Sequence, residues 1–223
     1  MKPLLVSLML LVGTGASADD FVSVPEGPLS DKDFYRLVAC SASPKAACKD
    51  RIVRWPVVAA ADLTVGIVAI DPDFPRSSRA LIRRALSTAI AEINAAGAGL
   101  TLRLAPVGAR PDIAVHLLGL EETDVIDGSI DPDLAGGEMG AGYVYVWWNG
   151  RGEITRAIIA FARDIHPDDI RSIALEELVQ ATGLLTDIDN PWYRRRSIFS
   201  QDSNEVTRLQ PQDLMALRRH YPP

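Results

Sequence analysis

The chain has 223 residues, with 23 Lys and Arg against 29 Asp and Glu, and a formal net charge of −6. Hydrophobic residues make up 48% of the chain, which is too apolar for disorder and sufficient for a packed core. The acidic balance argues against a nucleic-acid partner, because nucleic-acid-binding proteins present a basic face. The chain has only three His, so a zinc site built from several His is hard to assemble.

The first 18 residues have the pattern of a signal peptide. Lys2 gives a positive start, an apolar run covers residues 4–12, and Ala16-Ser17-Ala18 is the small-x-small pattern that signal peptidase cleaves. The apolar run is too short for a permanent membrane anchor. The sequence therefore predicts a leader over residues 1–18 and an exported protein, periplasmic or secreted, without a transmembrane anchor.

Cys40 and Cys48 enclose a short loop of small residues that contains a Pro. In an oxidising compartment such a pair forms a local disulfide, whereas a redox dithiol has Cys-x-x-Cys spacing. We therefore expect a Cys40–Cys48 disulfide that fastens an N-terminal arm, residues 19–56, to a main domain over residues 57–223.

Strand and helix patterns alternate through the main domain, which predicts an α/β or α+β fold. Leu63–Ile70 alternates as a strand, and a helix capped by Ser77 or Ser78 is expected to continue to about Asn94 because its apolar residues recur on one helical face. Further strands are expected over 100–104, 112–118, 143–148 and 154–162, with a long acidic loop over 121–142.

The most informative segment is a helix predicted from about His166 to Gly183, where Gly suits a helix C-terminus. Glu176 and Gln180 are four residues apart and therefore point to the same side of this helix, with Glu177 beside them. A zincin helix presents the two His of His-Glu-x-x-His with this spacing.

These residues resemble the zinc motif of the metzincins, zinc peptidases of the matrixin kind, with the metal ligands replaced. In this resemblance Glu176 stands at the first His, Glu177 at the catalytic Glu, Gln180 at the second His, Gly183 at the motif's Gly and Thr186, followed by Asp187, at the third ligand. Ser197-Ile198-Phe199 resembles the Met-turn with Phe in place of Met, and residues 209–221 resemble the closing helix. The pattern Glu-Glu-x-x-Gln-x-x-Gly-Leu is also similar to that of the family DUF2927.

The resemblance implies a zincin-like, metzincin-like fold, in which a mixed twisted sheet packs on an active-site-type helix beside an N-terminal arm. An amide at Gln180 and a hydroxyl at Thr186 are poor substitutes for imidazole as zinc ligands. Without zinc, water keeps its ordinary pKa and Glu177 has no activated nucleophile to deprotonate. We therefore expect no metal, no cofactor and no ordinary zinc proteolysis. The leading hypothesis is a pseudopeptidase that binds a peptide, protein or envelope component through Glu176, Gln180, Thr186 and Asp187.

Other functions stay open at this level. A peptidase-like or glycosidase-like hydrolase would use Glu177 as its base, with an unusual metal or none. An all-oxygen Ca²⁺ or Mg²⁺ site would use Glu176, Gln180 and Asp187. A purely structural envelope domain would leave these side chains on a solvated helix face.

Two further features have simple interpretations. The basic run at residues 194–196 is expected to form a solvated loop held by Glu176 or Asp187. His220 falls in the last turn of the closing helix, where the helix dipole favours a cation.

Overall fold

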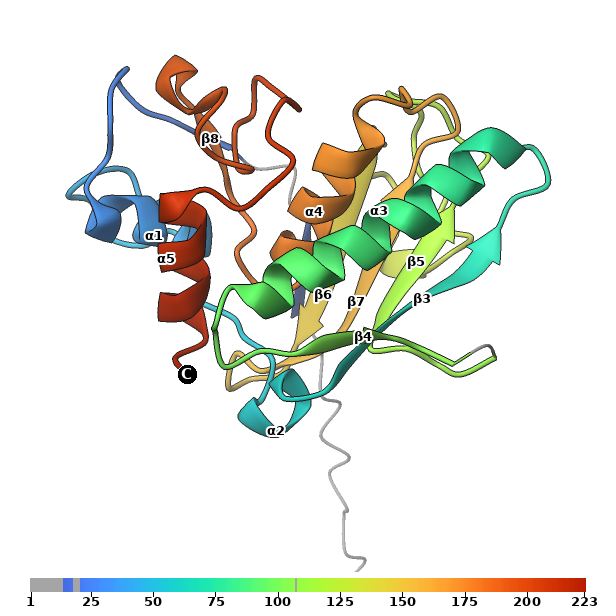
Figure 1. Cartoon of the computed structure of the whole chain (residues 1–223), viewed down its shortest axis with the longest axis horizontal. Helices are drawn as coiled ribbons and strands as arrows, with labels where there is room; N and C mark the ends of the chain where they lie inside the picture. Colours follow the sequence, from blue (N-terminus) through green and yellow to red (C-terminus); the bar gives the residue numbers. More distant parts are fainter. Residues whose placement is uncertain (1–13, 18–20, 107) are drawn as a thin grey trace, which may run out of the picture.

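The computed structural model describes residues 14–17, 21–106 and 108–223 (Figure 1). Within these residues, a mixed sheet has the strand order β1-β6-β7-β5-β3-β4. Its strands are β1 (Thr14–Ser17), β3 (Leu63–Ile70), β4 (Leu102–Leu104), β5 (Ile113–Leu117), β6 (Gly142–Trp148) and β7 (Ile154–Phe161). Strands β4, β3, β5 and β7 are mutually parallel, and β6 runs antiparallel to both β7 and β1. The prediction of a mixed sheet in an α+β fold is therefore confirmed.

Two helices cover one face of the sheet. These are α3 (Arg76–Ala95) and α4 (Ile170–Gln180), which pack against each other and against the strands (Figure 1). The apolar stripe of α3, which includes Ile82, Leu86 and Ile93, is buried in this layer, as its periodicity predicted. The expected cap at Ser77 or Ser78 is wrong. Pro75 precedes the helix instead, because its φ of −61° suits a helix start, and Ser78 is buried.

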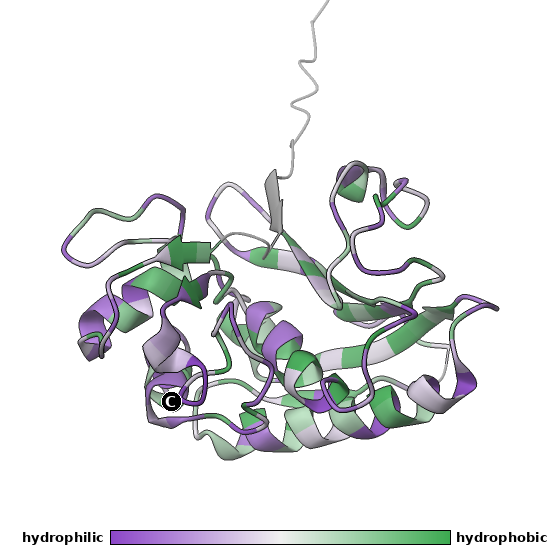
Figure 2. Cartoon of the chain, turned by 90° about the horizontal axis from the view of Figure 1, so that it is seen from above, coloured by the Kyte–Doolittle hydropathy of each residue, from purple (hydrophilic) through white to green (hydrophobic). Residues whose placement is uncertain are grey.

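The opposite face of the sheet carries the long loop over residues 121–142, which includes the short helix η1 (Pro132–Leu134). Leu134 and Met139 of this loop pack against Tyr143 and Trp147 of β6 in a second apolar cluster. Figure 2 shows the helical layer on one side of the sheet and the loop layer on the other, with hydrophobic positions alternating along the strands. The sheet is thus covered on both faces.

Most of the remaining elements form a lobe beside the sheet (Figure 1). They are β2 (Phe21–Ser23), α1 (Asp31–Cys40), β8 (Asp187–Asp189), η2 (Pro191–Tyr193) and α5 (Pro211–His220). The short helix α2 (Val57–Ala60) lies apart from this lobe, just before β3 (Figure 1). Strand β2 pairs in parallel with β8, and α1 packs side by side with α5. Phe34 of α1 contacts the rings of Tyr193 and Phe199, so the N-terminal segment shares the main core. The expected disulfide joins Cys40, at the end of α1, to Cys48.

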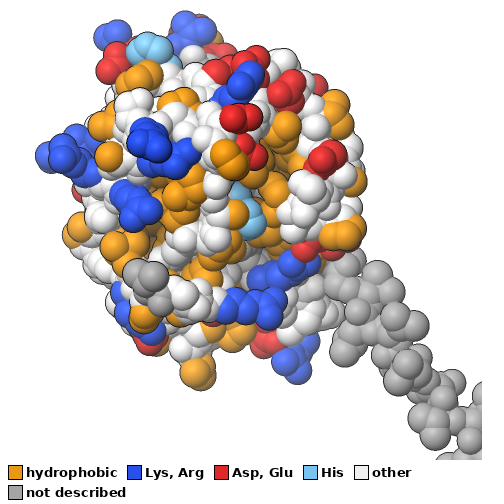
Figure 3. Space-filling model, turned by 90° about the vertical axis from the view of Figure 1, so that its right-hand side faces the viewer, with side chains coloured by type: hydrophobic (Ala, Val, Ile, Leu, Met, Phe, Trp, Pro, Cys, Tyr) orange, Lys and Arg blue, Asp and Glu red, His pale blue; other side chains and the backbone are white. Residues whose placement is uncertain are grey.

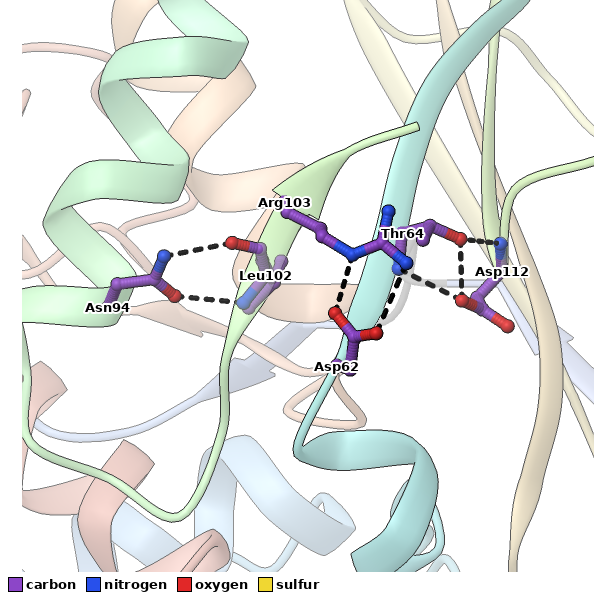
Figure 4. A network of polar contacts seen from close by, with 6 residues as sticks. All are labelled: Asp62, Thr64, Asn94, Leu102, Arg103 and Asp112. Atoms are coloured by element: carbon purple, nitrogen blue, oxygen red, sulfur yellow. Dashed lines mark hydrogen bonds and ion pairs between the residues drawn. The ribbon is translucent and has the colours of Figure 1, made fainter. Parts of the chain in front are cut away.

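Polar contacts fix the turn from α3 into β4 and the start of β3 (Figure 4). The side chain of Asn94 donates to the carbonyl of Leu102 and accepts from its amide, both at 2.9 Å. Arg103 of β4 forms an ion pair with Asp62. These contacts hold the far edge of the sheet without touching the candidate residues.

The predicted leader is described only in part. Thr14–Ser17 forms β1, and its backbone pairs with Tyr145–Trp148 of β6. The rest of the predicted leader lies outside the described residues. Among the described residues, no helix has the length and apolar character needed to cross a membrane.

Candidate functional site

A cavity of about 270 Å³ lies between the second half of α4, the start of β6, and the segment that begins with β8. Four carboxyl groups line it, from Glu122, Glu176, Glu177 and Asp187. Amide and hydroxyl side chains complete its polar wall: Gln180, Ser200, Gln201 and Asn204. Among the described residues that line the cavity, none is Lys, Arg or His. The cavity is therefore strongly acidic.

The two sides of the cavity meet at Asp187. Gln180 Nε2 donates a hydrogen bond of 2.8 Å to Asp187 Oδ1, and the side chain of Glu176 is hydrogen-bonded to the same carboxyl group. Burial raises the pKa of Glu176 well above its usual range, and the nearby carboxyl groups of Asp187 and Glu177 raise it further. Glu176 therefore keeps its proton to a higher pH than an exposed Glu would.

Glu177 points to a different wall of the cavity from Glu176, as expected for adjacent helical residues. A Cβ atom added to Gly142 would lie 2.3 Å from Glu177 Oε1 and 2.5 Å from Ile173 Cγ2. Since such distances are impossible for a real side chain, β6 passes α4 this closely only because residue 142 is Gly. Glu177 is consequently buried, with 7% of its surface exposed.

Thr186 is separated from the other candidates. Its hydroxyl is hydrogen-bonded to Ser41 Oγ at 2.8 Å, and its backbone amide donates to the carbonyl of Val38 in α1. Thr186 is absent from the described lining of the cavity. The structure thus brings together Glu176, Glu177, Gln180 and Asp187. Thr186 is buried instead against the C-terminal end of α1.

The turn after α4 requires its glycine. Gly183 has φ +106°, and a Cβ atom there would lie 2.2 Å from the carbonyl oxygen of Val53. Nearby, the hydroxyl of Tyr221 donates to the carbonyl of Thr182 at 2.6 Å and accepts from the amide of Trp55 at 2.9 Å. The end of α4 is therefore held by the segment at Val53–Trp55 and by Tyr221, which follows α5.

A buried carboxyl group holds the turn that contains Ser197, Ile198 and Phe199. Ser197 Oγ donates to Asp213 Oδ1 at 2.7 Å, and the amides of Ile198 and Gln210 donate to Asp213 Oδ2. Burial raises the pKa of Asp213 to about 7, although these three donors act in the opposite direction. Phe199 is fully buried and packs on Phe34, and its carbonyl accepts a hydrogen bond from Ile188 of β8.

The lining residues that the sequence did not identify include Glu122, Ser200, Gln201 and Asn204. They lie in loops, where a single sequence shows no periodicity that would mark an inward side chain. Only Ser200 had an indirect signal, because it follows the Ser-x-Phe turn.

The basic run at residues 194–196 is exposed and lies outside any helix or strand, as expected, but the expected contact with Glu176 or Asp187 is wrong. Arg194 pairs with Asp202, Arg195 with Glu205, and Arg196 stacks on the ring of Trp192. These arginines are paired within the loop that follows η2, so they do not reach Glu176 or Asp187.

The expectation for His220 was also wrong. Its side chain is fully buried, with Nε2 3.0 Å from the carbonyl oxygen of Val53 and Nδ1 3.3 Å from the hydroxyl of Tyr35. Burial lowers the pKa of His220 to about 3, because charging a group away from water is unfavourable. The ring is therefore neutral, and the helix dipole does not hold a cation there.

A larger hollow of about 580 Å³ lies at the other edge of the sheet, between β3, β4 and α3. On that side of the molecule basic and hydrophobic side chains intermingle (Figure 3). Apart from Arg83, its lining is mostly apolar and contains none of the candidate residues. The acidic cavity is thus the better candidate site.

Fold and cavity together define a class: an α+β protein whose mixed sheet and one helix enclose a carboxylate-lined cavity. A family model described as protein of unknown function (DUF2927) matches residues 32–223. The chain belongs to this family. The matched region runs from α1 to the C-terminus and includes every residue that lines the cavity. No curated protein matches the chain.

Proposed function

We propose that this chain is an exported, pseudopeptidase-like protein with a metzincin-like fold and no zinc site, which binds an extended peptide or protein segment beside the acidic cavity. It acts by binding, in the periplasm or outside the cell, and carries no cofactor. Two features support this proposal: the edge of β6 and the acidic cavity next to it.

The resemblance to metzincins is supported by the way its separate segments meet. The helix α4 presents Glu176 and Gln180 to one cavity, and Gly183 turns the chain directly after it. The Ser-x-Phe turn at residues 197–199 is held by Asp213 of α5. Segments far apart in the sequence thus meet around α4, as the resemblance implies.

The side chains at the ligand positions do not fit a catalytic zinc. Gln180 directs its amide nitrogen to Asp187, and a protonated nitrogen cannot bind a metal. The raised pKa of Glu176 favours its protonated form, which is a poor metal ligand, and the hydroxyl of Thr186 is hydrogen-bonded to Ser41. Among the described residues, no group of three or more His, Cys, Asp or Glu is arranged to hold a metal ion. Zinc catalysis is therefore not part of the proposed function.

The observation that carries the proposal is the pairing of β1 with β6. Thr14–Ser17 adds an antiparallel strand to the outer edge of β6, whose first residues, Gly142 to Val144, line the cavity. This edge therefore accepts an extended chain by main-chain hydrogen bonds, which is a general mode of peptide recognition. Cleavage after Ala18 would remove β1 and leave the same edge open to a ligand.

A peptide that carries the β1 sequence Thr-Gly-Ala-Ser between flanking alanines tests this proposal. We expect the exported chain, purified after leader removal, to bind this fluorescein-labelled peptide in a polarisation assay. In a strand, alternate amides point toward the partner strand. N-methylation of one alternate set should abolish binding, and N-methylation of the other set should leave it intact. Equal effects of both sets, or no binding of the unmodified peptide, would reject strand addition.

Zinc content tests the other half of the proposal. Inductively coupled plasma mass spectrometry of the chain, purified without chelator or affinity histidines, should give far less than one zinc ion per chain. The double variant Glu176→His with Gln180→His should bind more zinc than the native chain, because imidazole is the stronger ligand. Stoichiometric zinc in the native chain would overturn the proposal.

A hydrolase is the second candidate, and the raised pKa of Glu176 favours it. A carboxyl group that keeps its proton beside a second carboxyl group, here Glu177, is typical of acid–base pairs. Under this hypothesis, turnover of labelled casein or of a nitrophenyl glycoside would disappear in Glu177→Gln while the fold is retained. Absence of turnover in the native chain, together with peptide binding, would leave the binding function.

A further inference from the structure

We propose that the cavity receives a basic side chain, Arg or Lys, from an extended peptide paired with β6. This inference rests on the proposed function, because it assigns a ligand chemistry to the same edge and cavity. It goes further by stating which side chain the bound strand must carry and at which position.

Charge is the first argument. The described lining contributes four carboxyl groups, from Glu122, Glu176, Glu177 and Asp187, and no basic side chain. Arg163 pairs with Glu121 and Arg195 with Glu205, so neither of these ion pairs involves a lining carboxyl group. Even with Glu176 protonated, the described lining has acidic side chains and no basic one, so the electrostatic potential of the cavity favours a cation.

The hydrogen-bonding capacity of the wall is a second, independent argument. Ser200 is a lining residue of the cavity and is buried, and its Oγ has no hydrogen-bond partner among the described residues. The carboxyl oxygens add further acceptors, while the amide nitrogen of Gln180 is already committed to Asp187. A guanidinium carries five N–H donors and an ammonium three, and neither accepts a hydrogen bond. A basic side chain therefore supplies hydrogen-bond donors to a wall that is rich in acceptors.

Size and register specify the position. A volume of about 270 Å³ is small for a pocket that holds a whole small molecule and suits a single long side chain. The register pairs Ser17 with Tyr145, so the third residue beyond that point in a continuous strand lies opposite Gly142. Directly opposed residues of antiparallel strands point to the same face of the sheet. Gly142 faces Glu177 on α4, so the residue opposite Gly142 enters the cavity.

Three labelled peptides of sequence Thr-Gly-Ala-Ser-Ala-Ala-Xaa, with Xaa Arg, norleucine or Glu, test the inference against the exported chain after leader removal. We expect the Arg peptide to bind about tenfold more tightly than the norleucine peptide, because charge-assisted hydrogen bonds replace apolar contact. The Glu peptide should bind most weakly. The preference for Arg should decline at high salt, as electrostatic recognition requires.

Two cavity variants and one matched control make the test specific. Glu122→Gln and Asp187→Asn should each reduce the preference for Arg over norleucine severalfold, because each replaces an acidic side chain of the cavity wall by a neutral one. Asp168→Asn removes an exposed carboxylate that is absent from the cavity lining, and it should leave the preference unchanged.

The outcomes separate this inference from the proposed function. Equal binding of all three peptides would overturn the inference and leave strand addition at β6 standing. A preference for Arg that survives both cavity variants would also overturn it, because the cation would then bind elsewhere. Failure of every peptide to bind would overturn the inference together with the proposed function.

Discussion

Burial changes the charge of two residues of α5 in opposite directions. His220 is neutral because its pKa falls to about 3, and Asp213 keeps a proton up to about pH 7 because its pKa is raised. Neither side chain lines the cavity. Both act on stability, since a pKa that differs between the folded and unfolded chain makes the free energy of unfolding depend on pH.

The carboxyl group of Asp213 should destabilise the fold as pH rises from about 4 to about 7. In this window the folded chain binds a proton at Asp213 that the unfolded chain has released, so stability is highest at the acidic end. Asp213→Asn removes this titration. We expect the variant, compared with the native chain, to become relatively more stable by a few kcal/mol between pH 4 and pH 7 in urea unfolding. Parallel pH profiles of the two proteins would contradict the assignment.

Gly183 is the backbone residue on which the end of α4 most depends. Its φ of +106° and the carbonyl of Val53 leave no room for a side chain. Gly183→Ala should lower the free energy of unfolding by more than about 3 kcal/mol, because strain and overlap add. Gly97→Ala is the control, since Gly97 has φ +69° but open space around it, and it should cost about 1 kcal/mol. Equal losses measured by thermal unfolding would refute the role of the Val53 contact.

At the scale of elements, the cavity exists because α4, β6 and β8 converge. The helix supplies Glu176, Glu177 and Gln180, while β8 supplies Asp187 from a different segment. Strand β8 is itself held by β2 on one side and by the turn at Phe199, whose carbonyl accepts from the amide of Ile188. The position of Asp187 therefore depends on β2 and on the turn at Phe199.

The disulfide should stabilise this lobe. Cys40 ends α1, which packs on α5 and bonds to Thr186 just before β8. Reduction should lower the free energy of unfolding by about 2–3 kcal/mol, because the closed loop no longer restricts the unfolded chain. The measurement is a melting curve with and without reductant, with the double variant Cys40→Ser and Cys48→Ser as a control that reductant should not affect. An unchanged melting temperature of the native chain would contradict the prediction.

At the scale of the whole molecule, the sheet has two different edges. At the edge formed by β4, the side chain of Asn94 binds the backbone of Leu102, whereas the edge at β6 is covered by β1 alone, as far as the described residues show. A strand edge with free amides and carbonyls is a template for another chain. Removal of a leader that contains β1 would therefore leave the edge of β6 free to pair with another chain.

Export should thus change both the mass of the chain and the protection of β6. Intact-mass spectrometry of the exported chain should show loss of residues 1–18. Hydrogen exchange of the backbone amides at residues 145–148 should be faster in this processed chain than in an uncleaved chain, because their partners in β1 are gone. A chain exported with residues 1–18 in place would refute the leader.

Local sequence patterns were enough to predict several helices and strands and one side of the cavity. Strand β3 has the bounds that its alternation predicted, and α4 places Glu176 and Gln180 on one face because a helix has a fixed period. The pairing of Cys40 with Cys48 was likewise predictable, since the two lie close in the chain. Each of these features depends on residues only a few positions apart.

The tertiary structure alone decided the other side of the cavity and the charges around it. It brought Asp187 to Glu176, directed Thr186 toward Ser41, and buried His220 beside Val53. Local periodicity contains no information about such contacts, because they join segments that meet only when the whole chain packs. Burial then sets the protonation of Glu176 and His220, so the chemistry of the site followed from the packing.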